Sequence, residues 1–202
     1  MLFVHLPRTS GTFLGEFFRH IPEIKNVVHT PVRKIKNRKD YFSFGFIRNP
    51  FDWYVSRYFY CCGNKLSEQG VSTGCDLGMP GKHFKEHCKS FKEHLEYGKK
   101  IKGFWLSDRY NQMFCNAKDE LLLNYVCRFE NLKKEIDLLI KKTSNENKEF
   151  YKLIWEAYNR IYGKQQKKTN STEHNHYTKY YTPELIKLIS EKDKLIIDRY
   201  GY

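Results

Sequence analysis

The sequence has no apolar stretch long enough to span a bilayer, and it lacks the charged and apolar regions of a signal peptide before its first predicted strand. As given, the chain is therefore expected to be soluble. Cysteine is sparse, because six thiols in 202 residues fall short of the density of a disulfide scaffold. The set Cys61, Cys62, Cys75, His83, His87 and Cys88 contains no Cys-x2-Cys pair. We expect no metal site, and we expect most of the cysteines to be thiols, with a local disulfide as the minor alternative.

Acidic residues are also few in comparison with basic ones. The chain carries 36 Lys and Arg against 23 Asp and Glu, a formal net charge of +13, with a pI near 9.4. This field favours an anionic partner such as a nucleotide, an acidic or sulfated glycan, or a nucleic acid. A generically lysine-rich surface would give the same charge. The length suits one domain, residues 1–202, with a full core and an α/β fold by default.

The chain opens with a pattern of strand, polar loop and helix. A short apolar run ends at Leu6, and the apolar spacing from Phe13 to Ile21 predicts one buried helix face. Backbone N–H groups at such a helix start bind phosphate or sulfate, and Arg8 adds a forked cation. A Walker loop is excluded because the stretch ends Ser10-Gly11-Thr12 rather than Gly-Lys-Ser/Thr. An ordinary strand-to-helix turn is the alternative.

A second junction of the same kind follows. The aromatic run Tyr41–Ile47 predicts a buried strand that ends at Arg48. Asn49 is a natural N-cap and Pro50 a natural first residue for a helix that runs to about Cys61 and carries Ser56 two turns in. A guanidinium fork and a hydroxyl near a helix start would both favour a phosphate dianion.

These two stretches resemble the donor motifs of sulfotransferases that use 3′-phosphoadenosine-5′-phosphosulfate (PAPS). His5 to Thr12 is similar to the 5′-phosphosulfate loop, of form H-I-P-K-T-G-G-T, and Phe46 to Tyr58 is similar to the 3′-phosphate signature F-x-x-R-N-P-x-D-x-x-x-S. The resemblance implies a three-layer, P-loop-NTPase-like α/β fold with a parallel sheet flanked by helices. It implies PAPS as donor and no metal. The donor-binding residues that it assigns are Pro7, Arg8, Thr9, Ser10, Gly11, Thr12, Phe13, Arg48, Ser56, Lys168, Asn170 and Ser171.

The resemblance also implies a general base near the end of the second strand, predicted over Glu23–Val28. His29 occupies that place and would deprotonate the acceptor, while Arg8 would steady or protonate the leaving phosphate. Glu16 and Glu23 are weaker substitutes. His174 and His176 are further alternatives, and a surface histidine is the plain structural interpretation of His29.

The rest of the chain is expected to support this site. Residues 62–82 are predicted to form a long glycine-containing loop, which the resemblance places on the acceptor side. Leu121–Phe129 is the longest apolar run and a predicted core strand. The passage R-F-E-N-L at 128–132, also seen in sulfotransferases, is interpreted as structural. Thr182 and Pro183 begin a predicted helix that Gly201 ends.

The predicted function is sulfonate transfer to an acceptor hydroxyl. A glycan is favoured by the C-terminal stretch H-Y-x-x-Y-Y-T-P-E-L, which resembles carbohydrate sulfotransferases; another alcohol is the alternative. Because membrane anchors are typical of Golgi members, this chain is expected to be cytoplasmic or an excised catalytic domain. No membrane or nucleic-acid partner is expected, and nothing in the sequence specifies an oligomeric state.

Two other functions fit parts of the pattern. A small-molecule or nucleotide kinase would share the architecture, and it would prefer ATP as its donor. A non-catalytic nucleic-acid-binding protein would use the basic runs Arg33–Lys39 and Lys164–Lys168, with steeply salt-dependent binding.

Overall fold

The computed structural model describes residues 1–9, 11–19, 21, 24–27, 30–62, 89–143, 152, 156, 159 and 174–202. Within helices, no side chains are described for residues 11–13, 61–62, 140 and 143. The chain divides into two compact units that are each discontinuous in sequence. Unit 1 comprises Met1–Arg48 and Tyr110–Ser171, and unit 2 comprises Asn49–Arg109 and Thr172–Tyr202. That the whole chain forms a single domain stays a prediction.

Unit 1 is built on a parallel sheet of four strands in the order β2-β1-β3-β4. The strands are β1 (Leu2–Val4), β2 (Lys25–Val27), β3 (Ser43–Ile47) and β4 (Tyr125–Arg128). The central strands β1 and β3 are buried along their whole length, as expected of strands covered on both faces. The register pairs Phe3 with Phe44 and Ile47 with Arg128.

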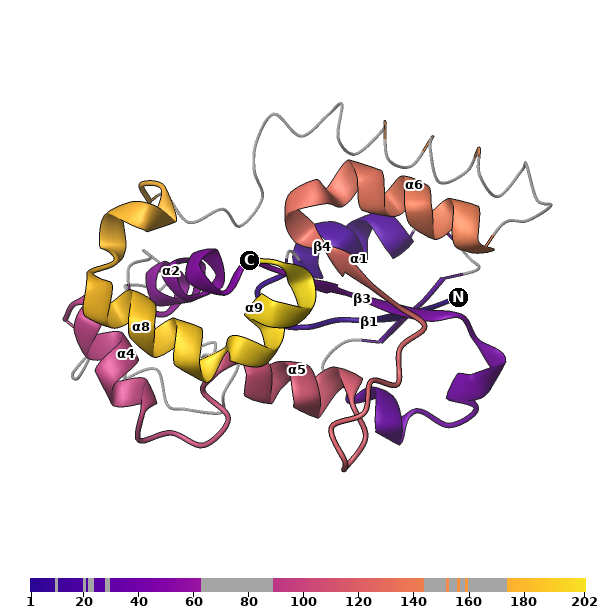
Figure 1. Cartoon of the computed structure of the whole chain (residues 1–202). Coiled ribbons are helices and arrows are strands. Elements are labelled where there is room, and N and C mark those ends of the chain that lie inside the picture. Colours follow the sequence, from indigo (N-terminus) through magenta and orange to yellow (C-terminus); the bar gives the residue numbers. More distant parts are fainter. Residues whose placement is uncertain are drawn as a thin grey trace, which may run out of the picture. The chain divides into compact units, whose positions relative to one another are not determined.

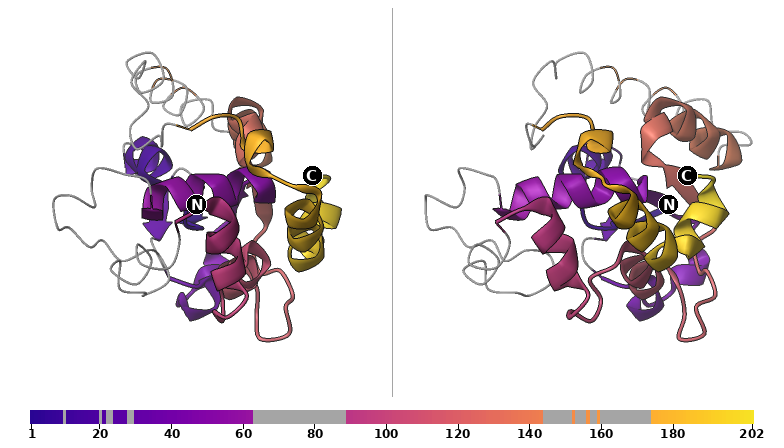
Figure 2. Two further views of the ribbon diagram at one scale, coloured as in Figure 1. Left: turned by 90° about the vertical axis from the view of Figure 1, so that its left-hand side faces the viewer. Right: turned by 60° about the vertical axis from the view of Figure 1, so that its left-hand side comes forward.

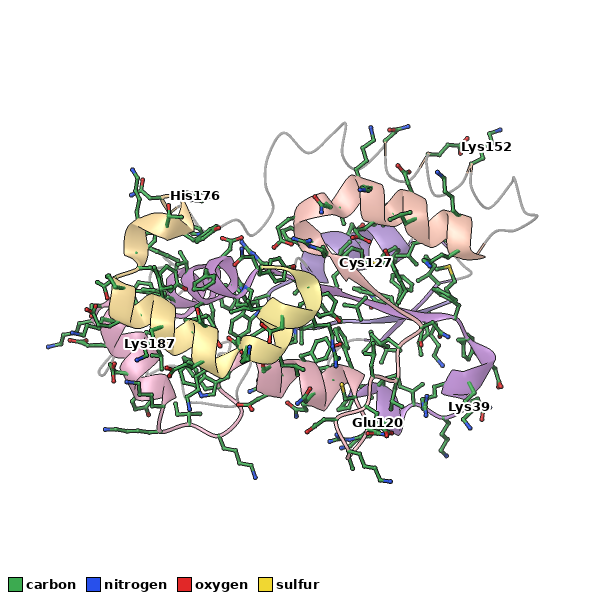
Figure 3. The ribbon with its side chains drawn as sticks, in the orientation of Figure 1. Lys39, Glu120, Cys127, Lys152, His176 and Lys187 are labelled. Atoms are coloured by element: carbon green, nitrogen blue, oxygen red, sulfur yellow. The ribbon has the colours of Figure 1, made fainter. Side chains whose placement is uncertain are left out.

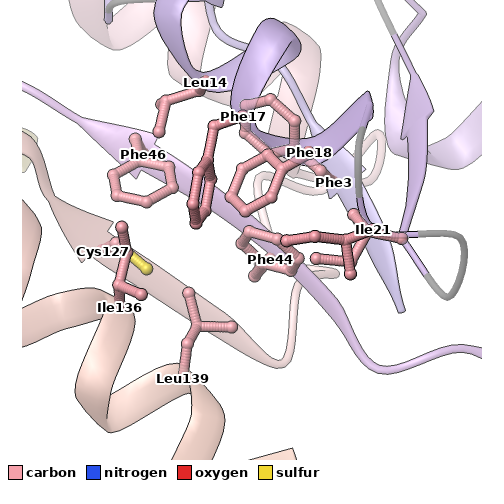
Figure 4. Packing of buried hydrophobic residues seen from close by; sticks show 11 residues of the cluster. Phe3, Leu14, Phe17, Phe18, Ile21, Phe44, Phe46, Cys127, Ile136 and Leu139 are labelled. Carbon is pink, nitrogen blue, oxygen red and sulfur yellow. The ribbon is translucent and has the colours of Figure 1, made fainter. Parts of the chain in front are cut away.

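Helices α1 (Gly11–Arg19) and α6 (Leu132–Thr143) cover one face of this sheet (Figure 1). Figure 4 shows the side chains that join them, with α1 above the strands and α6 beside β4. Cys127 lies in this layer as a buried free thiol (Figures 3 and 4). The cluster consists of Phe3, Leu14, Phe17, Phe18, Ile21, Ile24, Phe44, Phe46, Cys127, Ile136 and Leu139. Burying each large apolar side chain contributes about 1.5–3 kcal/mol, so this layer contributes strongly to the stability of unit 1.

The opposite face of the sheet receives the end of α5 (Leu106–Phe114). A Cβ on Gly45 would lie 2.6 Å from the Phe114 ring and 3.0 Å from the Val4 carbonyl oxygen. Glycine is therefore required in the middle of β3, because only a residue without a side chain lets the ring approach so closely. The helix–sheet–helix layers confirm the predicted α/β class.

Unit 2 is helical. Its helices are α2 (Pro50–Cys62), α4 (Phe91–Gly98), α8 (Pro183–Lys192) and α9 (Lys194–Tyr200), together with the first part of α5. Asn49 caps α2, because its Oδ1 accepts the Phe51 N–H at 2.9 Å. Thr182 caps α8 with Pro183 in the first position, as the sequence predicts. Ser90 caps α4, because its Oγ accepts the Glu93 N–H at 3.2 Å.

The prediction of one continuous C-terminal helix is wrong. Figures 1 and 2 show α8 and α9 meeting at an angle, and the break falls at Asp193. The Asp193 side chain is fully buried, and it accepts hydrogen bonds from Tyr54 Oη at 2.7 Å and from the Ser107 N–H at 2.7 Å. The Tyr54 hydroxyl also accepts the Leu106 N–H at 2.8 Å. A tertiary network thus overrides the local helical pattern.

The predicted strand Leu121–Phe129 is too long. β4 spans only Tyr125–Arg128, which pair with Phe44–Ile47 of β3. One residue earlier, the Asn124 side-chain oxygen accepts the Ser43 N–H at 2.8 Å. Before β4, Leu121 forms an isolated antiparallel bridge with Cys115 and is 38% exposed. Glycine-containing residues 63–88 and the late segment 144–173, apart from residues 152, 156 and 159, lie outside the described residues.

Candidate donor-binding site

A tight turn ends β1. The Thr9 N–H donates to the Leu6 carbonyl oxygen at 3.4 Å across Pro7 and Arg8, and Arg8 has a φ of 65°. Proline in the second position and a positive φ in the third are the features of a type II turn, in which glycine is the usual third residue. The turn therefore holds a non-glycine residue in a conformation that costs about 1–2 kcal/mol.

The buried side chain of Thr9 stabilises this turn. This side chain is fully buried, and its hydroxyl donates to the Leu6 carbonyl oxygen at 2.6 Å. Pro7 is also buried, whereas Arg8 is half-buried at the tip. The Thr9 side chain supports the shape of the turn, and Arg8 carries its charge.

Helix α1 begins two residues later, at Gly11. Gly11, Thr12 and Phe13 form its first turn, whose N–H groups have no acceptor within the helix. The partial positive charge of a helix start adds to the charge of Arg8 at the same end of β1. That this junction binds an anion stays a prediction, since Ser10 and the side chains of Thr12 and Phe13 lie outside the described ones.

Arg48 follows β3 directly and reaches this turn. Its Nη1 donates to the Arg8 carbonyl oxygen at 3.3 Å, and its guanidinium carbon lies 5.5 Å from the centre of the Phe129 ring. The parallel register places Arg48 and Phe129 one residue beyond the paired Ile47 and Arg128. The structure therefore brings together Arg8 and Arg48, which the sequence assigns to two separate motifs.

A third cation ends the neighbouring strand. Arg128 is the last residue of β4 and is half-buried. The sequence analysis does not assign Arg128 to the site, because the passage around it is interpreted as structural. Its position after an apolar run, where the carboxyl end of a strand meets a helix, was the available signal. Arg8, Arg48 and Arg128 give the carboxyl edge of this sheet a strongly positive field.

Ser56 belongs to unit 2, on the second turn of α2, and is 4% exposed. His29, Lys168, Asn170 and Ser171 lie outside the described residues. Of the alternative bases, His174 is half-buried and His176 is exposed. The His174 Nδ1 lies 2.7 Å from the Asn175 carbonyl oxygen, and the His176 Nδ1 lies 2.9 Å from Thr178 Oγ1.

Within the described part of the chain, no three His, Cys, Asp or Glu side chains gather as a metal site. No described helix is long and apolar enough to cross a membrane. Arg8, Arg48 and Arg128 are cations that an anionic ligand of unit 1 could contact.

Comparison with known proteins identifies the class. A sequence profile of the sulfotransferase family matches residues 18–202, a range that includes Arg48 and Ser56 and begins after the Arg8 turn. The chain belongs to the sulfotransferase family. A search of curated protein sequences returned no match.

A solved structure supports the fold. The crystal structure of mouse sulfotransferase SULT7A1 complexed with PAP is similar with a TM-score of 0.52 and 15% sequence identity. The similarity covers 95% of this chain and 83% of the mouse chain. At this identity the similarity concerns the fold, and it agrees with the predicted sheet flanked by helices.

Proposed function

We propose that the protein transfers a sulfonate group from PAPS to an acceptor hydroxyl, with the donor's phosphates at the carboxyl edge of the unit 1 sheet. The observation that carries this proposal is the contact of Arg48 with the strained Arg8 turn, since each residue comes from one of the two donor motifs. Family membership and the PAP-bound state of the mouse structure support the same donor.

In the proposed arrangement, the 5′-phosphosulfate lies at the Arg8 turn and the start of α1. Helix N–H groups and the Arg8 guanidinium would stabilise the charge that builds on the leaving 5′-phosphate oxygen. Arg48 and Ser56 would bind the 3′-phosphate, with Ser56 assigned from its spacing after Arg48 alone. Lys168, Asn170 and Ser171 are proposed to close the adenosine side, on sequence grounds only.

The chemical step needs positioning and charge stabilisation more than covalent help from the protein, as in phosphoryl transfer. The acceptor oxygen would attack sulfur in line, and the bond between sulfur and the 5′-phosphate oxygen would break. His29 would accept the proton of the acceptor hydroxyl. Fixed arginine charges take the place that a metal ion has in many phosphoryl-transfer enzymes.

For the acceptor we propose a carbohydrate hydroxyl. The support is the C-terminal stretch that resembles carbohydrate sulfotransferases, of which Thr182 and Pro183 form a helix start in unit 2. The net charge of +13 would also suit an acidic glycan. Sulfation assays over a panel of neutral and acidic glycans, with a simple phenol as the non-carbohydrate comparison, would decide between these acceptors.

Calorimetry with PAP (adenosine 3′,5′-bisphosphate, the expected product) and AMP tests the donor. We expect the wild type to prefer PAP, and Arg48→Ala to weaken PAP binding about a hundredfold while AMP changes little, because a truncated charge pair costs about 2–5 kcal/mol. The control is Arg33→Ala, an exposed arginine outside both motifs. Equal binding of PAP and AMP by the wild type contradicts the proposal, and a preference for ATP would favour a kinase.

A further inference from the structure

The Arg48 guanidinium is held between two partners within unit 1. It donates to the Arg8 carbonyl oxygen at 3.3 Å and lies 5.5 Å from the centre of the Phe129 ring. A guanidinium within about 6 Å of an aromatic face is attracted by the ring quadrupole. The ring and the carbonyl therefore restrict the guanidinium from two sides.

The position of Phe129 follows from the sheet. β3 and β4 are in register up to Ile47 and Arg128, so the next residue on each chain, Arg48 and Phe129, emerges at the same edge. The 3₁₀ turn Phe129–Asn131 begins at that point and leads into α6, whose Ile136 and Leu139 are anchored in the core. The Phe129 backbone is thus fixed by the sheet on one side and by a packed helix on the other.

We propose that Phe129 is a positioning residue for the donor's 3′-phosphate, because its ring orients Arg48. This inference rests on the proposed function, in which Arg48 binds that phosphate. An arginine with a free side chain loses rotamer freedom when it binds an anion, whereas a stacked arginine has lost that freedom in advance. The ring would therefore strengthen 3′-phosphate binding without touching the phosphate.

The same arrangement links the two donor motifs. The left-handed Arg8 backbone depends on the structure around it, and Arg48 supplies one of its hydrogen bonds through the carbonyl. Because the guanidinium has five N–H donors in a rigid fork, the bond to this carbonyl occupies one of them. Without the Phe129 ring, the Arg48 side chain would gain rotamer freedom, and the preference of the protein for a 3′-phosphate would fall.

The test compares Phe129→Leu, which keeps apolar bulk, with Phe129→Tyr, which keeps an aromatic face. The matched control is Phe42→Leu, the same replacement at a half-buried phenylalanine that precedes β3 at its other end. Dissociation constants for PAP and AMP are measured by calorimetry for each variant, together with thermal unfolding. We expect Phe129→Leu to weaken PAP binding about three- to tenfold while AMP changes less than twofold. Phe129→Tyr and Phe42→Leu should keep the wild-type ratio of the two constants.

Two results would overturn this inference. One is an equal loss of PAP and AMP affinity in Phe129→Leu, which would mean a general structural role. The other is an unchanged PAP affinity, whatever the shift in unfolding temperature. If the wild type itself shows no preference for PAP, the proposed function fails; if that preference depends on Arg48 but survives in Phe129→Leu, only the role of Phe129 fails.

Discussion

Two arginines nine residues apart, Arg48 of unit 1 and Arg57 of unit 2, lie in different surroundings. Arg48 ends a strand of unit 1, is half-buried and contacts the Arg8 turn. Arg57, in α2 of unit 2, is 2% exposed and donates to the Phe104 carbonyl oxygen at 2.8 Å. Its guanidinium carbon lies 4.1 Å from the centre of the Phe104 ring and 5.2 Å from that of Trp53.

In the proposed function, surroundings rather than residue type separate the ligand-binding cation Arg48 from the structural cation Arg57. The Arg57 guanidinium is buried inside unit 2, where its charge also affects the pKa of His94. Burial and the nearby Arg57 charge lower the pKa of His94, so this buried histidine stays neutral. Arg48 stands at the end of a sheet, where a ligand can approach a strand terminus.

The largest expected effect is the loss of the buried arginine. Arg57→Ala should lower the free energy of unfolding by about 3–4 kcal/mol, because it removes the ring contacts and leaves the Phe104 carbonyl without this donor. Urea unfolding measures the loss. The affinity of the folded protein for PAP should stay within about threefold of the wild type.

Arg48→Ala is the matched comparison, with an expected loss of stability below about 1 kcal/mol. The assignment of a structural role to Arg57 and a binding role to Arg48 is contradicted if Arg57→Ala removes PAP binding in protein that is still folded. It is also contradicted if Arg48→Ala destabilises the protein as much as Arg57→Ala does.

The next effect concerns pH. Burial raises the pKa of the Asp193 carboxyl from 3.8 to about 6, against the opposing hydrogen bonds from Tyr54 and Ser107. Because the folded-state pKa is the higher one, the stabilising contribution is complete below pH 3.8 and is lost as the pH rises through about 6. At one pKa unit per 1.36 kcal/mol, the loss is on the order of 3 kcal/mol.

Asp193→Asn removes this titration. Unfolding free energies of both proteins are measured in urea from pH 4 to pH 7.5. The value for the wild type should fall relative to that of the variant as the pH rises. A difference that is flat over this range, or that moves the other way, would contradict the assignment to Asp193.

A smaller loss is expected from one hydroxyl of the same network. Tyr54→Phe leaves the buried Asp193 carboxylate and the Leu106 N–H without the Tyr54 hydroxyl and should cost about 2 kcal/mol at neutral pH. Tyr181→Phe is the control, since that hydroxyl makes a part-buried bond to the Phe51 carbonyl oxygen at 2.8 Å and its loss should cost about 1 kcal/mol. Equal unfolding midpoints for the two variants would show that the network adds nothing beyond a single bond.

The smallest stability effect should come from the site itself. Arg8→Gly relieves the left-handed backbone but frees the unfolded chain, so the unfolding free energy should change by less than about 1 kcal/mol. PAP binding should nevertheless weaken at least tenfold, because a charge-assisted contact is lost. Arg8→Lys, which keeps the charge, is the comparison, and unchanged PAP affinity in Arg8→Gly would remove Arg8 from the proposed site.

Much of the fold follows from local patterns. The aromatic run before Arg48 is a buried strand, and Asn49 with Pro50 starts α2 as the sequence indicates. These features depend on neighbours in the chain, on capping and on apolar periodicity, which is why they can be predicted. The order of the donor motifs in the sequence also made an arginine-lined strand end predictable.

Other features depend on partners that are remote in the sequence. Asp193 breaks the C-terminal pattern because Tyr54 and Ser107 bind its carboxylate, and no local signal announces them. β4 is shorter than its apolar run, and just before it the side chain of Asn124, rather than its backbone, accepts the Ser43 N–H. Arg57 is an ordinary helix residue by sequence, yet it is buried among rings.

The sequence by itself determined the strand–loop–helix junctions, the excess of positive charge and the motifs that indicate a sulfotransferase, since each of these is written in neighbouring residues. Only the tertiary structure decided that Arg48 contacts the Arg8 turn and the Phe129 ring. Those contacts arise from the parallel register of three strands, and register is a property of pairing between segments that lie far apart in the chain.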